Sequence, residues 1–149
     1  MLNRLIDKTV VNGDYLLKLL KNNLLENNKG KVEEILNKLL VSLSFYDTKE
    51  NFYHGYVLGI FSGFLSDSYV VKSNRESGSG RFDVMIASMD KKIGFIFELK
   101  ITDKDMENTA KKALKQMKEK EYYKELELEG IENIYEYSIV FKGKKCIVR

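Results

Sequence analysis

The hydrophobic residues in the first half of the chain recur every three or four positions, which is the spacing of one helix face. This pattern predicts helices over about residues 14–27 and 31–43, joined by a short polar turn, and we expect them to form an antiparallel pair. A third helix is predicted from about residue 47 to 64.

Glycine recurs at every fourth position of this third predicted helix, at Gly55, Gly59 and Gly63. Each glycine costs a helix up to about 1 kcal/mol relative to alanine. We therefore expect another element to approach closely there, and the alternative is a slightly weak helix.

From residue 68 onward the spacing of hydrophobic residues changes to two, which is typical of strands. The elements expected after this change are strands over 68–73, 81–86 and 93–101, a helix from Asp103 or Asp105 to about 126, and strands over 134–141 and 146–148, with a loop over 74–80. Helices followed by three strands, a helix and two strands predict an α/β fold with a mixed sheet flanked by helices.

The length of 149 residues suits a single domain over 1–149, with a lead-in over 1–13, an N-terminal helical pair over 14–45 and a core over 47–149. Lysine and arginine number 25 against 22 acidic residues, so the net charge of +3 is too mild to indicate nucleic acid by itself.

The single Cys146 and single His54 exclude an intrachain disulfide and a zinc site built from cysteine and histidine. Any metal would be held by oxygens, as Mg²⁺ or Mn²⁺ is. No apolar run approaches the roughly 18 residues of a membrane span, and Asp7 interrupts the N-terminal segment where a signal peptide needs an apolar core. We expect a cytoplasmic protein without a membrane partner.

The residues that can carry chemistry lie in two of the predicted strands. Glu98 and Lys100 share one face of the strand over 93–101, whose other positions are strongly apolar. If this strand forms a hairpin with the preceding one, Asp83 comes roughly opposite them. Two carboxylates and an ammonium at one place suit a hard divalent cation that acidifies a bound water beside a phosphoryl group.

Asp83, fourteen further residues and then Glu98-Leu99-Lys100 resemble the motif of the PD-(D/E)XK nucleases. Four blocks in order, beginning at Glu50, Ser73, Phe95 and Ala113, resemble one subgroup, a nuclease domain commonly found C-terminal to an AAA-ATPase-like domain. The resemblance covers roughly residues 14–149. It implies a restriction-endonuclease-like core, here preceded by the N-terminal helical pair.

The resemblance also implies roles for particular residues. Asp83 and Glu98 match the metal-binding acids, with the backbone carbonyl of Leu99 as a third ligand, and Lys100 matches the catalytic lysine. Glu50 matches an acid of the first core helix that can assist metal binding, and Gln116 matches a polar residue on the helix after the motif.

The chain departs from the motif's name in one place, because Phe82 stands where a proline would precede the acid. No phosphate-binding G-x-x-x-x-G-K-[ST] sequence occurs, so no nucleotide cofactor is expected.

Each of these residues also has a plainer interpretation. Asp83 could pair with Arg81, and Glu98 with Lys100 could be a salt bridge on an exposed strand. Glu50 fits a helix-capping acid as well as a metal ligand. Arg75 and Arg81 flank a Gly/Ser loop, where they could contact phosphates or be solvated charges. The lysines over 111–120 favour a solvated helix face with i,i+4 pairs over a DNA-binding stripe.

The favoured hypothesis is a nuclease, endo- or exo-, that hydrolyses phosphodiester bonds in DNA with Mg²⁺ or Mn²⁺. Arg75, Arg81 and Lys100 are its candidate nucleic-acid contacts. The alternative is a binding module with the same fold that does not cleave, working as the companion of an AAA-type ATPase. A homodimer is expected by analogy with double-strand cutters.

Overall fold

The structure of the chain is a computed structural model that describes residues 15–41, 50–64, 68–76 and 81–149. Within these ranges, only the backbone is described for Glu50, Asn51, His54, 74–76 and 81–83. After a first helix over residues 15–25, the elements are α2 (Lys29–Val41), α3 (Glu50–Phe61), the 3-10 turn η1 (Ser62–Phe64), β1 (Tyr69–Glu76), β2 (Arg81–Ser88), β3 (Ile93–Ile101), α4 (Met106–Glu119), α5 (Tyr123–Leu128), β4 (Asn133–Lys142) and β5 (Lys145–Val148).

The strands form one five-stranded sheet in the order β1-β2-β3-β4-β5. Strands β1, β2 and β3 are antiparallel neighbours, β3 and β4 are parallel, and β5 returns antiparallel to β4. The parallel pair is possible because α4 and α5 carry the chain back between β3 and β4. The expected mixed α/β sheet is therefore confirmed.

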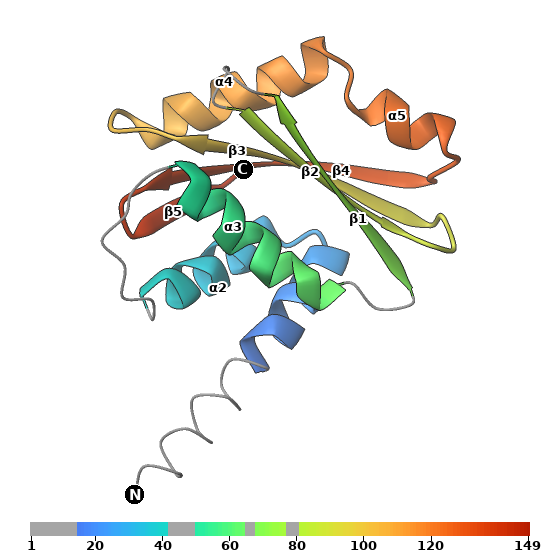
Figure 1. Cartoon of the computed structure of the whole chain (residues 1–149), viewed down its shortest axis with the longest axis horizontal. Helices are drawn as coiled ribbons and strands as arrows, with labels where there is room; N and C mark the ends of the chain where they lie inside the picture. The colour runs from blue at the N-terminus through green and yellow to red at the C-terminus, as the bar shows by residue number, and fades with distance from the viewer. Residues whose placement is uncertain (1–14, 42–49, 65–67, 77–80) are drawn as a thin grey trace, which may run out of the picture.

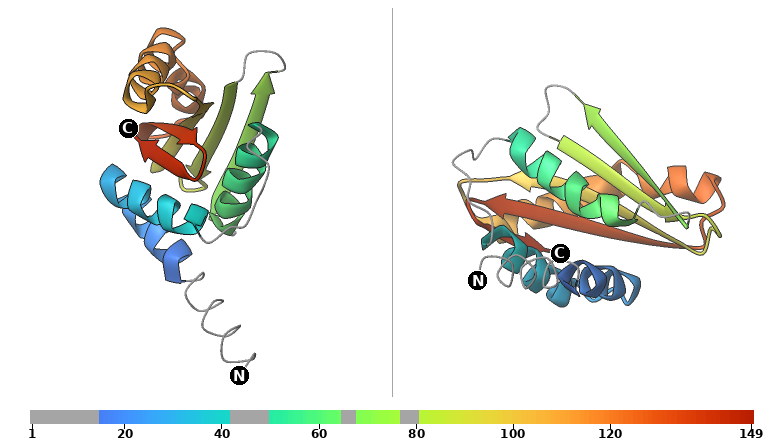
Figure 2. Two further views of the ribbon diagram at one scale, coloured as in Figure 1. Left: turned by 90° about the vertical axis from the view of Figure 1, so that its left-hand side faces the viewer. Right: turned by 60° about the horizontal axis from the view of Figure 1, so that its bottom comes forward.

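Helices cover both faces of the sheet, as Figures 1 and 2 show. The first helix, α2 and α3 lie on one side, which we call the lower face, and α4 and α5 lie on the other, the upper face. The lower face carries the larger hydrophobic core, in which Phe95, Phe97 and Leu99 of β3 are buried. The upper face has a smaller cluster that includes Ile96 of β3 and Met117 of α4.

Helix α2 is attached to the sheet edge through polar side chains. The Asn37 amide donates to the Cys146 carbonyl at 2.8 Å and accepts from the Cys146 N–H at 2.9 Å, while Glu33 accepts from the Val148 N–H at 2.9 Å. These bonds satisfy backbone groups of β5 that a sixth strand would otherwise pair. Helix α2 is thus fixed to the edge of the sheet by direct hydrogen bonds.

Most expected elements are confirmed, and β3 has the predicted bounds. The expectation of a loop from residue 74 was wrong, because β1 continues to Glu76 as the partner of β2. The single helix expected to about residue 126 was also wrong. Helix α4 ends at Glu119, Glu121 adopts a positive φ of 54°, and α5 begins at Tyr123.

The expected close approach to the glycines of α3 and η1 is also wrong. A Cβ added at Gly55, Gly59 or Gly63 would meet no atom within 4 Å. The alternative, a slightly weak helix, stays a prediction. Among the described residues, no helix combines the length and the apolar character needed to cross a bilayer.

Candidate active site

Glu98 and Lys100 lie on the upper face of β3, the middle strand of the sheet. Glu98 has no exposed surface, although it is a carboxylate, and Lys100 Nζ lies 3.3 Å from Glu98 Oε1. The Lys100 side chain keeps 20% of its surface exposed. The Glu98–Lys100 salt bridge of the plainer interpretation is therefore present. The exposed strand of that interpretation is wrong, since β3 lies between β2 and β4 and Glu98 is buried.

Asp83 of β2 is the direct cross-strand partner of Glu98 in the antiparallel β2–β3 pair. Residues directly opposite each other in such a pair belong to the same face of the sheet and lie about 5 Å apart. This confirms the register expected from the hairpin. The side chain of Asp83, and with it the possible ion pair to Arg81, lies outside the described side chains.

Leu99 lies between the two functional positions, in register with Phe82 of β2 and Ile139 of β4. Its side chain is buried in the core of the lower face, away from Glu98. Only its backbone carbonyl could therefore contribute to a site on the upper face.

Glu50 is the first residue of α3, and its side chain lies outside the described ones. One turn later, the Tyr53 hydroxyl donates to the Gly143 carbonyl at 2.8 Å, which ties the start of α3 to the β4–β5 turn. Tyr53 and Gly143 also line an open hollow of about 670 Å³ with Ile101 and Thr102, at the end of β3. The backbone therefore brings the beginning of α3 to the end of the strand that carries Lys100.

Gln116 lies on α4, the helix that covers β3 and β4 on the upper face. It is half-buried, next to the buried positions Ala113 and Met117. Its side chain makes no hydrogen bond to any described residue. The structure therefore places Gln116 on the expected helix without joining it to Glu98.

Arg75 and Arg81 lie on neighbouring strands, near the end of β1 and at the start of β2. In the register of this pair Arg75 faces Phe82 and Arg81 faces Glu76. Arg81 therefore lies two residues before Asp83 on β2, and Arg75 lies opposite the residue next to Asp83. The side chains of both arginines are outside the described ones.

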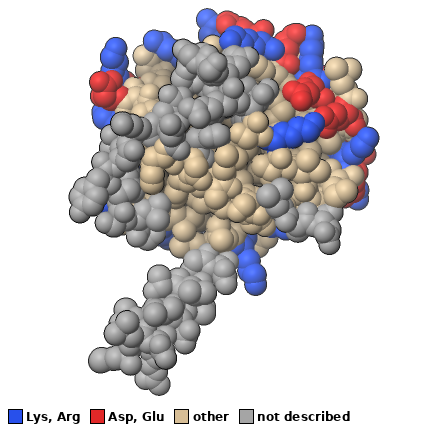
Figure 3. Space-filling model, in the orientation of Figure 1, with Lys and Arg blue, Asp and Glu red and all other residues tan. Residues whose placement is uncertain are grey.

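The lysines of α4 are exposed and mixed with acids, as expected for a solvated helix face. Lys115 Nζ lies 3.7 Å from Glu119 Oε1 in an i,i+4 pair. On the face drawn in Figure 3, lysines and arginines are interspersed with acids along the rim over α4 and α5. This part of the surface does not form a basic stripe.

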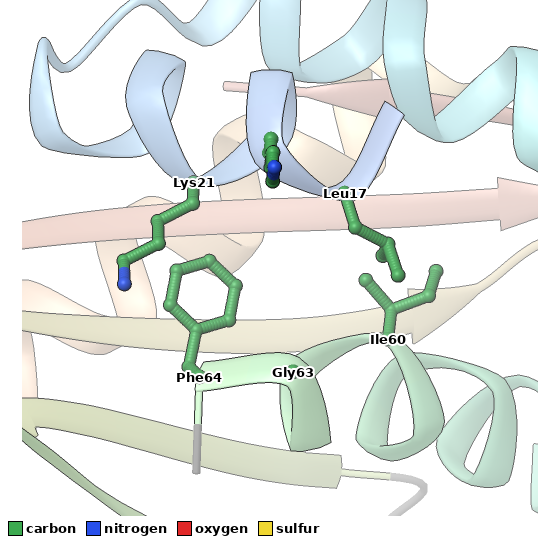
Figure 4. Close-up of a pocket in the computed structure, with 6 residues that line it drawn as sticks. Leu17, Lys21, Ile60, Gly63 and Phe64 are labelled. Carbon is green, nitrogen blue, oxygen red and sulfur yellow. The ribbon is translucent and has the colours of Figure 1, made fainter. Parts of the chain in front are cut away.

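A second hollow, of about 370 Å³, lies on the lower side of the molecule between the first helix and the end of α3. Leu17, Ile60 and Phe64 point into it, with Lys21 at its rim (Figure 4). Its described lining contains no carboxylate, so it offers no counterpart to the acids on the upper face.

Ser138 of β4 is a residue of this site that the sequence analysis missed. It is in register with Glu98 in the parallel β3–β4 pair, and it has no exposed surface. The available signal was the predicted strand over 134–141, in which the small polar Ser138 stands between Tyr137 and Ile139.

A metal at this site would be held by oxygens from neighbouring strands. Among the described side chains no group of three acidic, histidine or cysteine residues surrounds a common point. The expected set draws on Glu98, the Leu99 carbonyl, and the Asp83 and Glu50 carboxylates, whose side chains the structure does not describe. The types of donor, carboxylate and carbonyl oxygen, fit Mg²⁺ or Mn²⁺.

The mixed five-stranded sheet with helices on both faces is that of a restriction-endonuclease-like α/β protein. The chain belongs to the PD-(D/E)XK nuclease superfamily, whose family model matches residues 48–149. No curated protein and no solved structure is significantly similar to it.

Proposed function

We propose that this chain hydrolyses phosphodiester bonds in DNA with the help of Mg²⁺ or Mn²⁺. The observation that carries the proposal is the buried carboxylate of Glu98, 3.3 Å from the Lys100 ammonium and directly opposite Asp83 in the sheet. A buried carboxylate is costly unless a cation compensates it. Membership of the nuclease superfamily supports the same chemistry.

Asp83, Glu98 and the Leu99 carbonyl would hold the cation, and Glu50 would add a ligand if a second one binds. When bound, such a cation acidifies a water molecule and stabilises negative charge on a phosphoryl oxygen. The residues fit such a cation through the type of their donor atoms. Glu98 is a fully buried carboxylate, and the residue opposite it on the neighbouring strand is a second acid, Asp83, so both positions offer hard oxygen ligands.

Lys100 would orient the attacking water and the scissile phosphate. Its ammonium is held near Glu98 while part of the side chain remains exposed, so it can reach a substrate without leaving the carboxylate. The water oxygen bonds to phosphorus, the phosphorus–oxygen ester bond breaks, and the leaving oxygen takes up a proton. Arg75 and Arg81 would contact neighbouring phosphates.

We extend the proposal to location and partners. A cytoplasmic location is supported by the single, buried Cys146, which provides no intrachain disulfide. A homodimer and an AAA-type ATPase partner are supported by the resemblance of the sequence alone. Light scattering of the purified chain would test the dimer.

The decisive experiment is cleavage of plasmid and oligonucleotide DNA with Mg²⁺ or Mn²⁺. Lys100→Ala and Asp83→Ala should each lower the rate by at least about a hundredfold. Lys112→Ala, an exposed lysine on α4, is the matched control and should cleave like the wild type.

Equal activity in all four proteins would mean that another site or a contaminant cleaves the DNA, and would overturn the proposal. DNA binding without cleavage by the wild type would support the alternative, a binding module with this fold.

A further inference from the structure

Ser138 is a buried polar residue of β4, and it lies directly opposite Glu98 in the parallel β3–β4 pair. Its side chain has no exposed surface, and its Oγ has no hydrogen-bond partner in the described part of the chain. A buried hydroxyl without a partner costs free energy, and alanine would fill almost the same volume without that cost. The hydroxyl is therefore not explained by packing.

The backbone of Ser138 is firmly fixed. Its N–H donates to the Arg149 carbonyl at 2.8 Å, and its carbonyl accepts from the Arg149 N–H at 2.9 Å. On the other side β4 pairs with β3 over the whole length of β3. Of the polar groups of Ser138, only the hydroxyl lacks a hydrogen-bond partner among the described residues, and the strand that carries it is paired on both sides.

The register places this hydroxyl beside the candidate site. Ser138 is opposite Glu98, and Val140, two residues later, is opposite Lys100. Neighbouring strands lie about 4.8 Å apart, and residues in register belong to the same face. The serine, the buried carboxylate and the lysine thus occupy adjoining positions on the upper face.

Helix α4 covers β3 and β4 on this face with three buried side chains, of which only Met117 is large. Its buried positions include Ala110 and Ala113, which fill little volume above the two strands. A hydroxyl can rotate to donate to a carboxylate oxygen on the neighbouring strand. A nucleophilic role is excluded, since the Ser138 side chain has no surface that a substrate could reach.

We propose that Ser138 is a positioning residue for Glu98. With a cation bound, the Ser138 hydroxyl would donate to the Glu98 carboxylate and so hold this carboxylate in the orientation in which it binds the cation. Residues that hydrogen-bond to a metal ligand without touching the metal typically change metal affinity by about ten- to a hundredfold. This inference rests on the proposed role of Glu98 as a metal ligand.

The test measures Mn²⁺ affinity by isothermal titration calorimetry, and thermal unfolding of the metal-free protein, for the wild type and Ser138→Ala. We expect the variant to bind Mn²⁺ about tenfold more weakly or worse, with an unfolding midpoint that is unchanged or higher. A merely structural serine would not separate these two readouts.

Ser88→Ala is the matched control. Ser88 is also a buried serine, but its hydroxyl donates to the Ile93 carbonyl at 3.2 Å and accepts from the Ile93 N–H at 3.1 Å, at the far end of β3. This variant should lower the unfolding midpoint and leave Mn²⁺ affinity unchanged.

Wild-type Mn²⁺ affinity in Ser138→Ala would overturn the inference and leave the proposed function intact. A wild-type chain that binds no Mn²⁺ would overturn both. Weakened binding in the variant, together with a wild type that does not cleave DNA, would support the role of Ser138 and contradict the nuclease.

Discussion

The two faces of the sheet are built on different principles. The lower face, under the first helix, α2 and α3, is an almost purely hydrophobic core with packed aromatic rings. Among the described residues, the upper face under α4 and α5 has a smaller hydrophobic cluster with five buried members, and two buried polar residues, Glu98 and Ser138, lie on the same face. Packing supplies the stability of one face, while the other keeps polar groups buried where chemistry is proposed.

Strand β3 supplies both faces by alternation. Phe97 and Leu99 go to the lower core, whereas Ile96, Glu98 and Lys100 go to the upper face. The strand that carries Glu98 and Lys100 is therefore held in place by the packing of its other side chains in the lower core. The difference teaches that a substitution on the lower face should mainly change stability, and one near Glu98 should mainly change binding or catalysis.

The largest expected effect on stability is that of Phe97→Ala on the lower face. Phe97 has no exposed surface, and its ring centroid lies 4.6 Å from that of Phe61 and 5.2 Å from that of Tyr137. The loss of this packing should lower the free energy of unfolding by about 3–5 kcal/mol, measured by urea denaturation.

The exposed Leu128 is the control for hydrophobic truncation, and Leu128→Ala should change stability by no more than about 0.5 kcal/mol. A cost of Phe97→Ala below about 2 kcal/mol would contradict the view that the lower core supplies most of the stability.

A smaller loss is expected from Gly94→Ala, which tests how closely the upper face is packed. A Cβ at Gly94 would lie 2.9 Å from Leu126 Cδ1 and 3.0 Å from Ile131 Cγ2. These side chains must move, so the free energy of unfolding should fall by about 1–3 kcal/mol.

Gly59→Ala is the matched control, since a Cβ at this exposed position of α3 would meet nothing within 4 Å. It should raise stability by about 0.5–1 kcal/mol, because alanine favours the helix. If both substitutions changed stability in the same direction, the upper face would not be closely packed at Gly94.

The alternation of hydrophobic and polar residues was enough to predict β3 and its hairpin with β2, because a short turn fixes the register of an antiparallel pair. Counting residues outward from the same turn also predicted that Asp83 lies opposite Glu98 and Lys100. It did not find the break between α4 and α5, since Glu121 adopts its positive φ without a glycine or proline to mark it.

Ser138 could not be found by counting. It lies next to Glu98 through a parallel pairing, and the chain between them passes through two helices. No turn length fixes the register across such a connection. The glycines of α3 show the converse, because their regular spacing suggested a close contact that tertiary packing does not make.

A third and smaller effect is expected from Tyr137→Phe, which removes a polar contact from the lower core without removing the ring. The Tyr137 hydroxyl donates to Asn27 Oδ1 at 2.7 Å, at the turn between the first helix and α2. Its loss should lower the free energy of unfolding by about 0.5–1.5 kcal/mol in thermal or urea denaturation.

Tyr135→Phe is the control, because this half-buried tyrosine of the same strand makes no hydroxyl hydrogen bond to a described residue. It should change stability by less than about 0.5 kcal/mol. Equal losses in both variants would mean that the contact to Asn27 does not hold the helical pair to the sheet.

The smallest effect is a pH dependence from Glu136, on the upper-face side of β4. Burial raises the pKa of Glu136 above its ordinary 4.5, against the opposing pull of Lys118 and Lys29. Between the ordinary and the raised pKa the folded protein binds more protons than the unfolded chain, so this residue lowers stability as pH rises through that window.

Glu136→Gln should therefore gain stability relative to the wild type as pH rises from about 4 to about 7. Solvent screening at this half-exposed position limits the gain to about a few tenths of a kcal/mol, measured by urea denaturation across the pH range. Glu132→Gln, at an exposed position just before β4, controls for the loss of one negative charge. If the stability gain of Glu136→Gln shrank with rising pH, the lysines and not burial would control the pKa of Glu136. This part of the upper face would then hold a charge as readily as an exposed surface does.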